Sequence, residues 1–390
     1  MNILLFTSAM IENEFTSYQN NAVIKPNPSN QNFYAKLIKA LSVNNRVVVV
    51  SHRPFIEGMF EDKELPRYES SSNGIKYFYT KVQYSKRYKL FEEEKEIIKV
   101  ANEASKEFAD NKFLVITDTL RANLLKAAIR FSKRKNVVAV GMLTDNPANL
   151  SNTTNRYVRV IKNNVPKLDG YLSLSNGLLK AFQVQSKPNY IFEGLVDEII
   201  QTKKPAVGNY YFFGGALYER YGIKNLINGF LNANVKGKLV IAGTGPLRQY
   251  IFDNLEKNSR VLYLSQLPKE EIYALEQNAI ANINPRPFDR KLDEESVPSK
   301  LIEYLASGTP IISTIHGKLS EVFHNEIYWI SDGSQEGITK AFEDFEKEDQ
   351  KELKKMALNA RTKVIELYGV RPQGERISYF LDSLSSSLSK

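Results

Sequence analysis

The sequence has 390 residues, too many for one ordinary core and suited to two domains of roughly 150–200 residues each. Hydrophobic residues make up 42% and charged residues 25%, so both domains can bury normal cores. Cysteine is absent and only three histidines occur, which excludes disulfides and argues against a metal site. The N-terminus lacks the basic and apolar regions of a signal peptide. No apolar run approaches the ~20 residues that span a bilayer, so we expect a cytoplasmic protein.

The formal net charge of +9 favours anionic partners, such as nucleotides, nucleic acid or the acidic inner leaflet of a membrane. Much of the excess lies at residues 84–89 and 132–135. These clusters are either solvated loops and helix ends or a peripheral contact with an anionic membrane, to which the tyrosines of residues 74–89 would contribute. No aromatic and basic array typical of nucleic-acid binding is present, so we expect no nucleic-acid partner.

In the first half of the chain, short β-branched runs alternate with amphipathic stretches. The runs predict strands at 2–7, 46–51, 74–80, 113–117, 137–143, 170–174 and 190–193. The amphipathic stretches predict helices at 33–41, 90–109 and 120–132. In the first of them Phe33, Leu37, Ile38 and Leu41 share one helical face. This alternation of strand and helix predicts a parallel sheet with crossover helices.

The second half repeats the pattern. Strands are predicted at 209–213, 238–242, 260–264, 280–284, 310–314 and 326–330, with helices such as 224–232 and 269–277 between them. We therefore predict an N-terminal domain at 1–195, a linker at 196–208, and a C-terminal domain at 209–370. A last helix at 371–390 is expected to pack back on the first domain. Two doubly wound Rossmann-like domains would face each other across a cleft, with ligands beyond the carboxyl ends of the strands.

The most informative stretch runs from residue 284 to residue 310. Pro298 suits the first turn of a helix, where its missing N–H costs nothing, and Gly308 suits the position just after the helix end. The unpaired N–H groups around Ser299 and Lys300 would form an anion site at the helix N-terminus. The charge of Lys300 could reach a diphosphate. Glu303, one turn further in, could accept hydrogen bonds from ribose hydroxyls.

This stretch resembles the donor-site signature of retaining GT-B glycosyltransferases, family four in the usual classification, which make bacterial polysaccharides among other products. The signature contains two glutamates separated by seven residues, a spacing that Glu295 and Glu303 reproduce. The resemblance implies that Glu303 binds the ribose and that Glu295 holds hydroxyls of the donor sugar. It covers essentially residues 205–320. The absence of a DxD motif is consistent with a metal-independent enzyme that needs no cofactor besides its nucleotide-diphosphate sugar, for which a UDP-sugar is favoured.

A second segment of the resemblance is a strand that runs into Gly214 and Gly215, where glycine lets backbone approach a ligand closely. In the family, an arginine directly after the glycine and a lysine five residues later stabilise the leaving diphosphate. Here these positions hold Ala216 and Tyr221, which is a departure from the family pattern. The cations that could replace them are Arg220, Lys224, Arg286 and Lys300.

Residues 261–268 resemble the segment whose backbone reads the base of the nucleotide. Ser265 and Leu267 are the donor-binding candidates in this segment. The turn at residues 243–246 is expected to be tight, with no ligand contact.

The first domain gives weaker signals for an acceptor site. Asn32 and Phe33 open the first predicted helix, where they either cap the helix or contact the acceptor. Asp145 follows a strand at a position where many relatives carry a histidine that contacts the donor sugar, although an aspartate before Asn-Pro can equally cap a turn. Glu193 lies in a segment that resembles the interdomain hinge of the family.

These patterns predict a glycosyltransferase that transfers a sugar, with retention, to a glycan, lipid-linked or protein-linked acceptor. Glu295, Arg220 and Asp145 are the expected catalytic residues. One alternative is a non-catalytic GT-B subunit that binds a glycan or protein and supports an active partner; the missing arginine and lysine favour it. A lesser alternative is a sugar-nucleotide epimerase on the same architecture. The sequence does not identify the oligomeric state.

Overall fold

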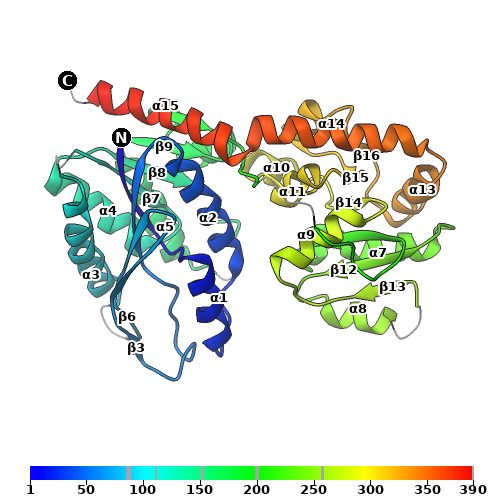
Figure 1. The fold of residues 1–390 in the computed structure, drawn as a ribbon, viewed down its shortest axis with the longest axis horizontal. Coiled ribbons are helices and arrows are strands. Elements are labelled where there is room, and N and C mark those ends of the chain that lie inside the picture. Colours follow the sequence, from blue (N-terminus) through cyan, green and yellow to red (C-terminus); the bar gives the residue numbers. More distant parts are fainter. Residues whose placement is uncertain (85–88, 110–111, 151–152, 198–201, 256–258, 389–390) are drawn as a thin grey trace. The chain divides into compact units, whose positions relative to one another are not determined.

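A computed structural model describes residues 1–390 except 85–88, 110–111, 151–152, 198–201, 256–258 and 389–390. The chain forms two compact units (Figure 1). Unit 1 comprises Met1–Leu195, Glu295–Val297 and Val370–Lys390, and unit 2 comprises Val196–Glu294 and Pro298–Gly369. The centre of the basic stretch at 84–89 and part of the predicted linker lie outside the described residues.

Unit 1 is built on an eight-stranded sheet with the order β10-β9-β8-β7-β1-β2-β5-β4. Its neighbouring strands are parallel except for the antiparallel pair of β4 and β5. The strands are β1 (Asn2–Thr7), β2 (Arg46–Ser51), β4 (Tyr68–Ser72), β5 (Ile75–Tyr79), β7 (Leu114–Asp118), β8 (Ala139–Leu143), β9 (Gly170–Ser173) and β10 (Asn189–Ile191). A separate antiparallel pair is formed by β3 (Glu64–Leu65) and β6 (Val82–Gln83).

The middle positions of the central strands β1 and β2, residues 3–6 and 47–50, are apolar on both faces because both faces of the sheet are covered. Successive side chains of a strand point to opposite faces. Ile3 and Leu5 of β1 therefore belong to one core, together with α2 and α15, whereas Leu4 and Phe6 belong to another, together with α3 and α4. The helices of unit 1 are α1 (Glu12–Asn21), α2 (Pro28–Ser42), α3 (Lys89–Ala104), α4 (Ala122–Lys135), α5 (Asn155–Asn164), α6 (Asn176–Ala181) and α15 (Val370–Leu388), with short 3₁₀ turns at η1 (Ser105–Glu107) and η2 (Val165–Lys167).

The C-terminal helix α15 packs on α2 within unit 1 (Figure 1). It buries Ile377, Leu381 and Leu384. Gln373 ties its first turns to the end of the sheet, because its Nε2 donates to the carbonyl oxygen of Phe192 at 3.0 Å.

Unit 2 contains a six-stranded sheet in which all neighbours are parallel, with the order β13-β12-β11-β14-β15-β16. The strands are β11 (Tyr210–Gly214), β12 (Lys238–Ala242), β13 (Val261–Tyr263), β14 (Asn282–Asn284), β15 (Ile311–Thr314) and β16 (Tyr328–Ile330). The helices are α7 (Ile223–Asn232), α8 (Arg248–Leu255), α9 (Lys269–Asn278), α10 (Arg290–Glu295, whose last residue belongs to unit 1), α11 (Ser299–Ser307), α12 (Gly317–Val322), α13 (Gln335–Phe345) and α14 (Gln350–Tyr368), with a 3₁₀ turn at η3 (Glu219–Tyr221).

One face of the second sheet carries an aromatic core. The ring of Tyr211 lies 4.9 Å from that of Phe342 and 6.0 Å from that of Phe230, both edge to face. Helices α7 and α13 cover this core, and the strands of the sheet supply many of its other members. Helix α11 ends at Ser307, and Gly308 follows it with φ 74°, as predicted. Pro298 lies at the N-cap, one residue before the helix, and not in its first turn.

Two of the tyrosines that suggested a membrane contact, Tyr77 and Tyr79, do not lie at the surface. Tyr77 and Tyr79 of β5 are buried, with at most 7% exposure, because they pack against the first core. Lys133, Arg134 and Lys135 are exposed at the end of α4, where cations favour the helix dipole. None of the helices in the described part of the chain is both long and apolar enough to cross a membrane.

Candidate functional site

The residues predicted to bind the donor gather at the carboxyl ends of the strands of unit 2. Gly214 ends β11 and Gly215 follows it, and Ser265 comes shortly after β13. Arg286 follows β14 in the same way. Since these strands are parallel neighbours in one sheet, the loops that follow them lie along one edge. This is the edge where doubly wound sheets bind ligands.

The loops after β11 and β12 are in direct backbone contact. The amide of Gly215 donates to the carbonyl oxygen of Ala242 at 2.9 Å, and that of Leu217 to the carbonyl oxygen of Thr244 at 2.9 Å. A Cβ on Gly243, which has φ 140°, would lie 1.8 Å from the carbonyl oxygen of Gly215. The turn at 243–246 therefore holds the Gly214–Gly215 loop in place.

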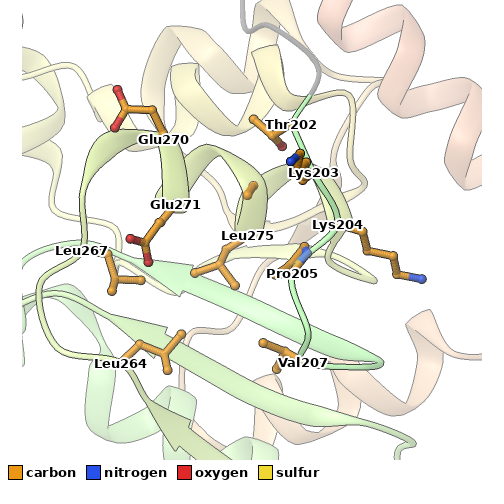
Figure 2. Close-up of a pocket in the computed structure, with 11 residues that line it drawn as sticks. Thr202, Lys203, Lys204, Pro205, Val207, Leu264, Leu267, Glu270, Glu271 and Leu275 are labelled. Atoms are coloured by element: carbon orange, nitrogen blue, oxygen red, sulfur yellow. The ribbon is translucent and has the colours of Figure 1, made fainter.

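The loop after β13 presents the two residues predicted near the base. Ser265 has φ 58°, a left-handed conformation, and its carbonyl oxygen accepts from the amide of Gly243 at 2.6 Å. Leu267 lines a cavity of about 570 Å³ within unit 2 (Figure 2). Leu264, Leu275 and Val207 add to its apolar wall. The remaining lining includes the charged residues Lys203, Lys204, Glu270 and Glu271.

Helix α11 holds three of the predicted donor-binding residues, Ser299, Lys300 and Glu303. Ser299, its first residue, is exposed. The ammonium of Lys300 lies 2.8 Å from Oε2 of Glu303 and 3.8 Å from Oε1 of Glu276. Burial works against the positive charge, but the nearby carboxylates of Glu303 and Glu276 outweigh it and raise the pKa of Lys300 above its usual value. Lys300 and Glu303 thus form an ion pair one turn apart.

Two residues of this cluster were missed from the sequence. Glu276 near the end of α9 is fully buried beside Lys300. Tyr304 is also buried, and its hydroxyl accepts from the amide of Gly214 at 2.9 Å, which fixes α11 against the loop after β11. A glutamate on an amphipathic helix gives no sign of burial before the fold is known. Tyr304 is adjacent to Glu303 in the signature, but its role needs the position of β11.

Two of the four candidate cations pair with carboxylates of loops at the carboxyl edge of the sheet. The ammonium of Lys224 lies 2.8 Å from Oε1 of Glu219. Nη2 of Arg286 lies 3.0 Å from Oδ1 of Asp293, which also lies 3.3 Å from Nδ1 of His316. With Lys300 paired to Glu303 as well, three of the predicted diphosphate cations already have anionic neighbours inside the protein.

Arg220 is arranged differently. Its guanidinium carbon lies 5.3 Å from the ring centroid of Tyr218 and 5.1 Å from that of Tyr221. Nη2 donates to the hydroxyl of Tyr221 at 3.3 Å. The residue is exposed, and stacking on aromatic faces holds a guanidinium without neutralising it. Tyr221 therefore orients the adjacent arginine.

Glu295 and Glu303, the two glutamates of the signature, belong to different units. Glu295 is part of unit 1, where Oε2 accepts from Nδ2 of Asn146 at 2.9 Å and from Nδ2 of Asn149 at 2.7 Å. Asp145 precedes these asparagines, and its Oδ1 accepts from the amide of Asn146 at 2.8 Å. The loop that follows β8 is thus polar. Asn146 connects Asp145 with Glu295, although the two acidic residues are far apart in the sequence. The contacts of these two asparagines with Glu295 could not be predicted from the sequence.

The acceptor candidates of unit 1 have different environments. Asn32 is exposed on α2. The ring of Phe33 stacks on that of Phe192 at 6.4 Å, so this side chain packs on the core. Glu193 has φ 60°, a strained conformation for a residue other than glycine, which concentrates at functional positions.

A buried aspartate at the carboxyl edge of unit 1 was also missed. Asp118 ends β7 with no exposure, and its oxygens accept from the amide of Leu120 at 2.9 Å and from Nδ2 of Asn30 at 3.2 Å. Burial raises the pKa of Asp118, although the nearby charge of Arg121 opposes the shift. The side chain holds together the start of α2 and the loop before α4.

No group of three or more His, Asp or Glu side chains in the described ranges is arranged to hold a metal ion. The carboxyl edge of unit 2 presents a helix N-terminus, an exposed guanidinium, glycine backbone and carboxylates.

Residues 197–363 match the family model "Glycosyl transferases group 1". The match lies almost entirely within unit 2, so the similarity to this family concerns that unit. No match is found among curated proteins.

Solved glycosyltransferase structures resemble both units. Sucrose-phosphate synthase from Thermosynechococcus elongatus has 15% identity and a TM-score of 0.67, covering 99% of this chain and 100% of its own. Anabaena HepE in complex with UDP has 14% identity and a TM-score of 0.65, covering 98% and 99%. Trehalose-6-phosphate synthase from Burkholderia multivorans has 11% identity and a TM-score of 0.65, covering 100% and 97%. The chain has the fold of these GT-B enzymes, in which two Rossmann-like units follow each other.

Proposed function

We propose that this protein is a glycosyltransferase that binds a UDP-sugar in unit 2 and transfers the sugar, with retention, to a glycan, lipid-linked or protein-linked acceptor. The observation that carries the proposal is Glu303, held by Lys300 one turn into α11, within the segment that matches the group 1 glycosyltransferases. The choice of UDP draws on Anabaena HepE, a structural neighbour solved with UDP and with UDP-glucose.

In the proposed donor site, Glu303 accepts hydrogen bonds from the ribose. The base lies by Ser265 and Leu267, beside the apolar cavity. The N–H groups at Ser299 and Lys300 and the backbone at Gly214 and Gly215 face the diphosphate. Arg220 is the cation that neutralises the leaving diphosphate, because its charge is exposed and oriented by Tyr221.

The proposed reaction needs no protein nucleophile and no metal. As the glycosidic bond breaks, negative charge develops on the diphosphate, and preorganised donors stabilise it by several kcal/mol (~3 for one donor). The acceptor hydroxyl attacks from the face that the phosphate leaves and gives its proton to that phosphate, so configuration is retained. Glu295 and Asp145 would hold the sugar in this step, and Asn32, Phe33 and Glu193 would line the acceptor side.

The first test is a thermal-shift panel with UDP-, dTDP- and GDP-sugars, with the Glu303→Ala variant as control. A rise in Tm with one class of nucleotide, lost in the variant, is expected. No shift with any of them would remove the donor-site assignment.

Kinetics then separate the two glutamates. Glu303→Ala is expected to raise mainly the donor KM, because the ribose contact is the same in the ground and transition states, whereas Glu295→Ala is expected to lower mainly kcat. NMR of the first product gives its anomeric configuration. An inverted product would contradict retention, and unchanged kinetics in both variants would contradict the assignment of both residues.

A second candidate function is a non-catalytic subunit that supports an active partner. The specific observation in its favour is that Lys224, Arg286 and Lys300 are paired with carboxylates, while the family's usual arginine and lysine positions hold Ala216 and Tyr221. Binding of a UDP-sugar without any release of UDP, in the presence of candidate acceptors, would favour this function.

Peripheral contact with an anionic inner membrane is part of the proposal, and the exposed residues Lys133, Arg134 and Lys135 support it. Co-sedimentation with anionic vesicles at low salt tests it, with reversal of the three charges as the control. Equal sedimentation of both proteins would exclude these residues as the contact.

A further inference from the structure

Three charged side chains from two helices meet at the start of α11. Lys300 and Glu303 belong to α11, and Glu276 belongs to α9. The ammonium of Lys300 lies 2.8 Å from the carboxylate of Glu303 and 3.8 Å from that of Glu276. The cluster thus shares one positive charge between two negative charges.

The burial of these side chains is graded. The side chain of Glu276 has no exposure, that of Glu303 has 17% and that of Lys300 has 40%. A carboxylate without exposure is unfavourable unless cations and hydrogen-bond donors surround it. The buried Glu276 and the partly exposed Glu303 therefore both attract the ammonium of Lys300. Both interactions act in the same direction on the pKa of Lys300 and keep its ammonium charged.

The charge balance of the cluster suits one part of a nucleotide better than another. These three side chains, one ammonium and two carboxylates, sum to −1, so they add no attraction for a diphosphate to that of the backbone N–H groups. A ribose carries no charge, and its two hydroxyls are donors that an ionised carboxylate accepts well. The cluster is therefore built to recognise the diol rather than the phosphates.

We propose that Glu276 and Lys300 are positioning residues that hold the Glu303 carboxylate for the ribose hydroxyls of the donor, and that Lys300 does not neutralise the diphosphate. This inference rests on the proposed function, because it concerns the same donor site. It assigns a role to Glu276, which is buried and touches no ligand itself, and it changes the role expected for Lys300.

Binding of UDP and of 2′,3′-dideoxy-UDP, measured by calorimetry, separates the two roles of Lys300. For the wild-type protein, loss of the two hydroxyls is expected to weaken binding about 10- to 100-fold. In Lys300→Met and in Glu276→Gln, UDP is expected to bind about tenfold more weakly, with little change for dideoxy-UDP. Lys300→Arg, which keeps the charge, is expected to restore part of the preference for UDP.

Lys347→Met is the matched control, because Lys347 also forms an ion pair with a residue three positions away, Asp344, at 2.9 Å. It is expected to leave both affinities unchanged. Melting curves without nucleotide test the cluster independently of the ligand: Lys300→Met is expected to lower the Tm, and Lys300→Met combined with Glu276→Gln to recover part of the loss.

Equal weakening of UDP and dideoxy-UDP in Lys300→Met would place the ammonium at the diphosphate and overturn the inference alone. A Tm of the double variant that falls below that of Lys300→Met would overturn it as well, because Glu276 would then not depend on Lys300. If the wild-type protein binds neither ligand, the proposed function fails and this inference fails with it.

Discussion

Replacing Gly243 with alanine places a methyl group where the backbone of the neighbouring loop lies. The new Cβ would be 1.8 Å from the carbonyl oxygen of Gly215, and φ 140° is unfavourable for any residue with a side chain. The backbone strain costs about 1–3 kcal/mol, and shifting the packed loop costs another ~1–3 kcal/mol. The free energy of unfolding of unit 2 is therefore expected to fall by about 2–6 kcal/mol.

Fluorescence of the single tryptophan measures this loss. Trp329 lies in β16 of unit 2, so its signal during urea unfolding reports on that unit. Gly208→Ala is the matched control, because Gly208 also lies in unit 2 and has φ 74°, but a Cβ there would have nothing within 4 Å. It is expected to cost only ~1 kcal/mol, the penalty of a left-handed alanine.

The comparison isolates the contact between the two loops. If Gly243→Ala and Gly208→Ala lowered the free energy of unfolding equally, the close approach of Gly243 to Gly215 would not be what requires glycine. If Gly243→Ala left stability unchanged but abolished nucleotide binding, the loop after β11 would have moved without cost. That result would refute the reasoning that the turn at 243–246 is packed against it.

Two further predictions concern unit 1. Leu381→Ala removes a side chain of α15 with no exposure and is expected to lower the free energy of unfolding by about 2–5 kcal/mol. Tyr379→Ala, at 80% exposure on the same helix, should change it little. Circular dichroism during urea unfolding measures both variants, and equal losses would contradict the packing of α15 on unit 1. The second concerns Asp118, whose pKa is raised by burial against the opposing charge of Arg121. The native state then keeps a proton that the unfolded state releases, so this contribution to stability is largest at acid pH and falls as the pH rises through the folded pKa. Unfolding free energies of the wild type relative to Asp118→Asn should decline between acid and neutral pH, and a difference independent of pH would contradict the burial argument.

Most of the fold could be predicted because the strands of a sheet covered on both faces are unmistakable as short apolar runs. Strands β1, β2 and β12 begin and end at the predicted residues. The predicted helix at 90–109 was too long, because α3 ends at Ala104 and a 3₁₀ turn follows.

The main omission was the antiparallel strand β4. Asn73 and Gly74 have φ 50° and 77°, as in the two-residue hairpin turn that Asn-Gly favours, and this dipeptide was visible in the sequence. The strand escaped because its residues are polar: Tyr68–Ser72 alternates between exposed and half-buried positions at the edge of the sheet. Helix α14 was also overlooked, although Leu353, Ala357, Ala360 and Val364 have helical spacing and are buried.

For the candidate site, the sequence could supply residue types and spacing but no partners. Four cations near a donor-site signature suggested four ways to neutralise a diphosphate. The structure distinguishes them, because the carboxylates that pair with three of them come from Glu219, Asp293 and Glu303, and a paired cation has less charge to offer to a substrate. Arg220 keeps an exposed charge and gains its orientation from the ring and the hydroxyl of Tyr221. The tyrosine at position 221 is therefore consistent with a cation that has moved to Arg220 as well as with one that has been lost. Removal of Arg220 should distinguish the two candidate functions: it should abolish transfer by a weak transferase and change nothing in a subunit that only binds.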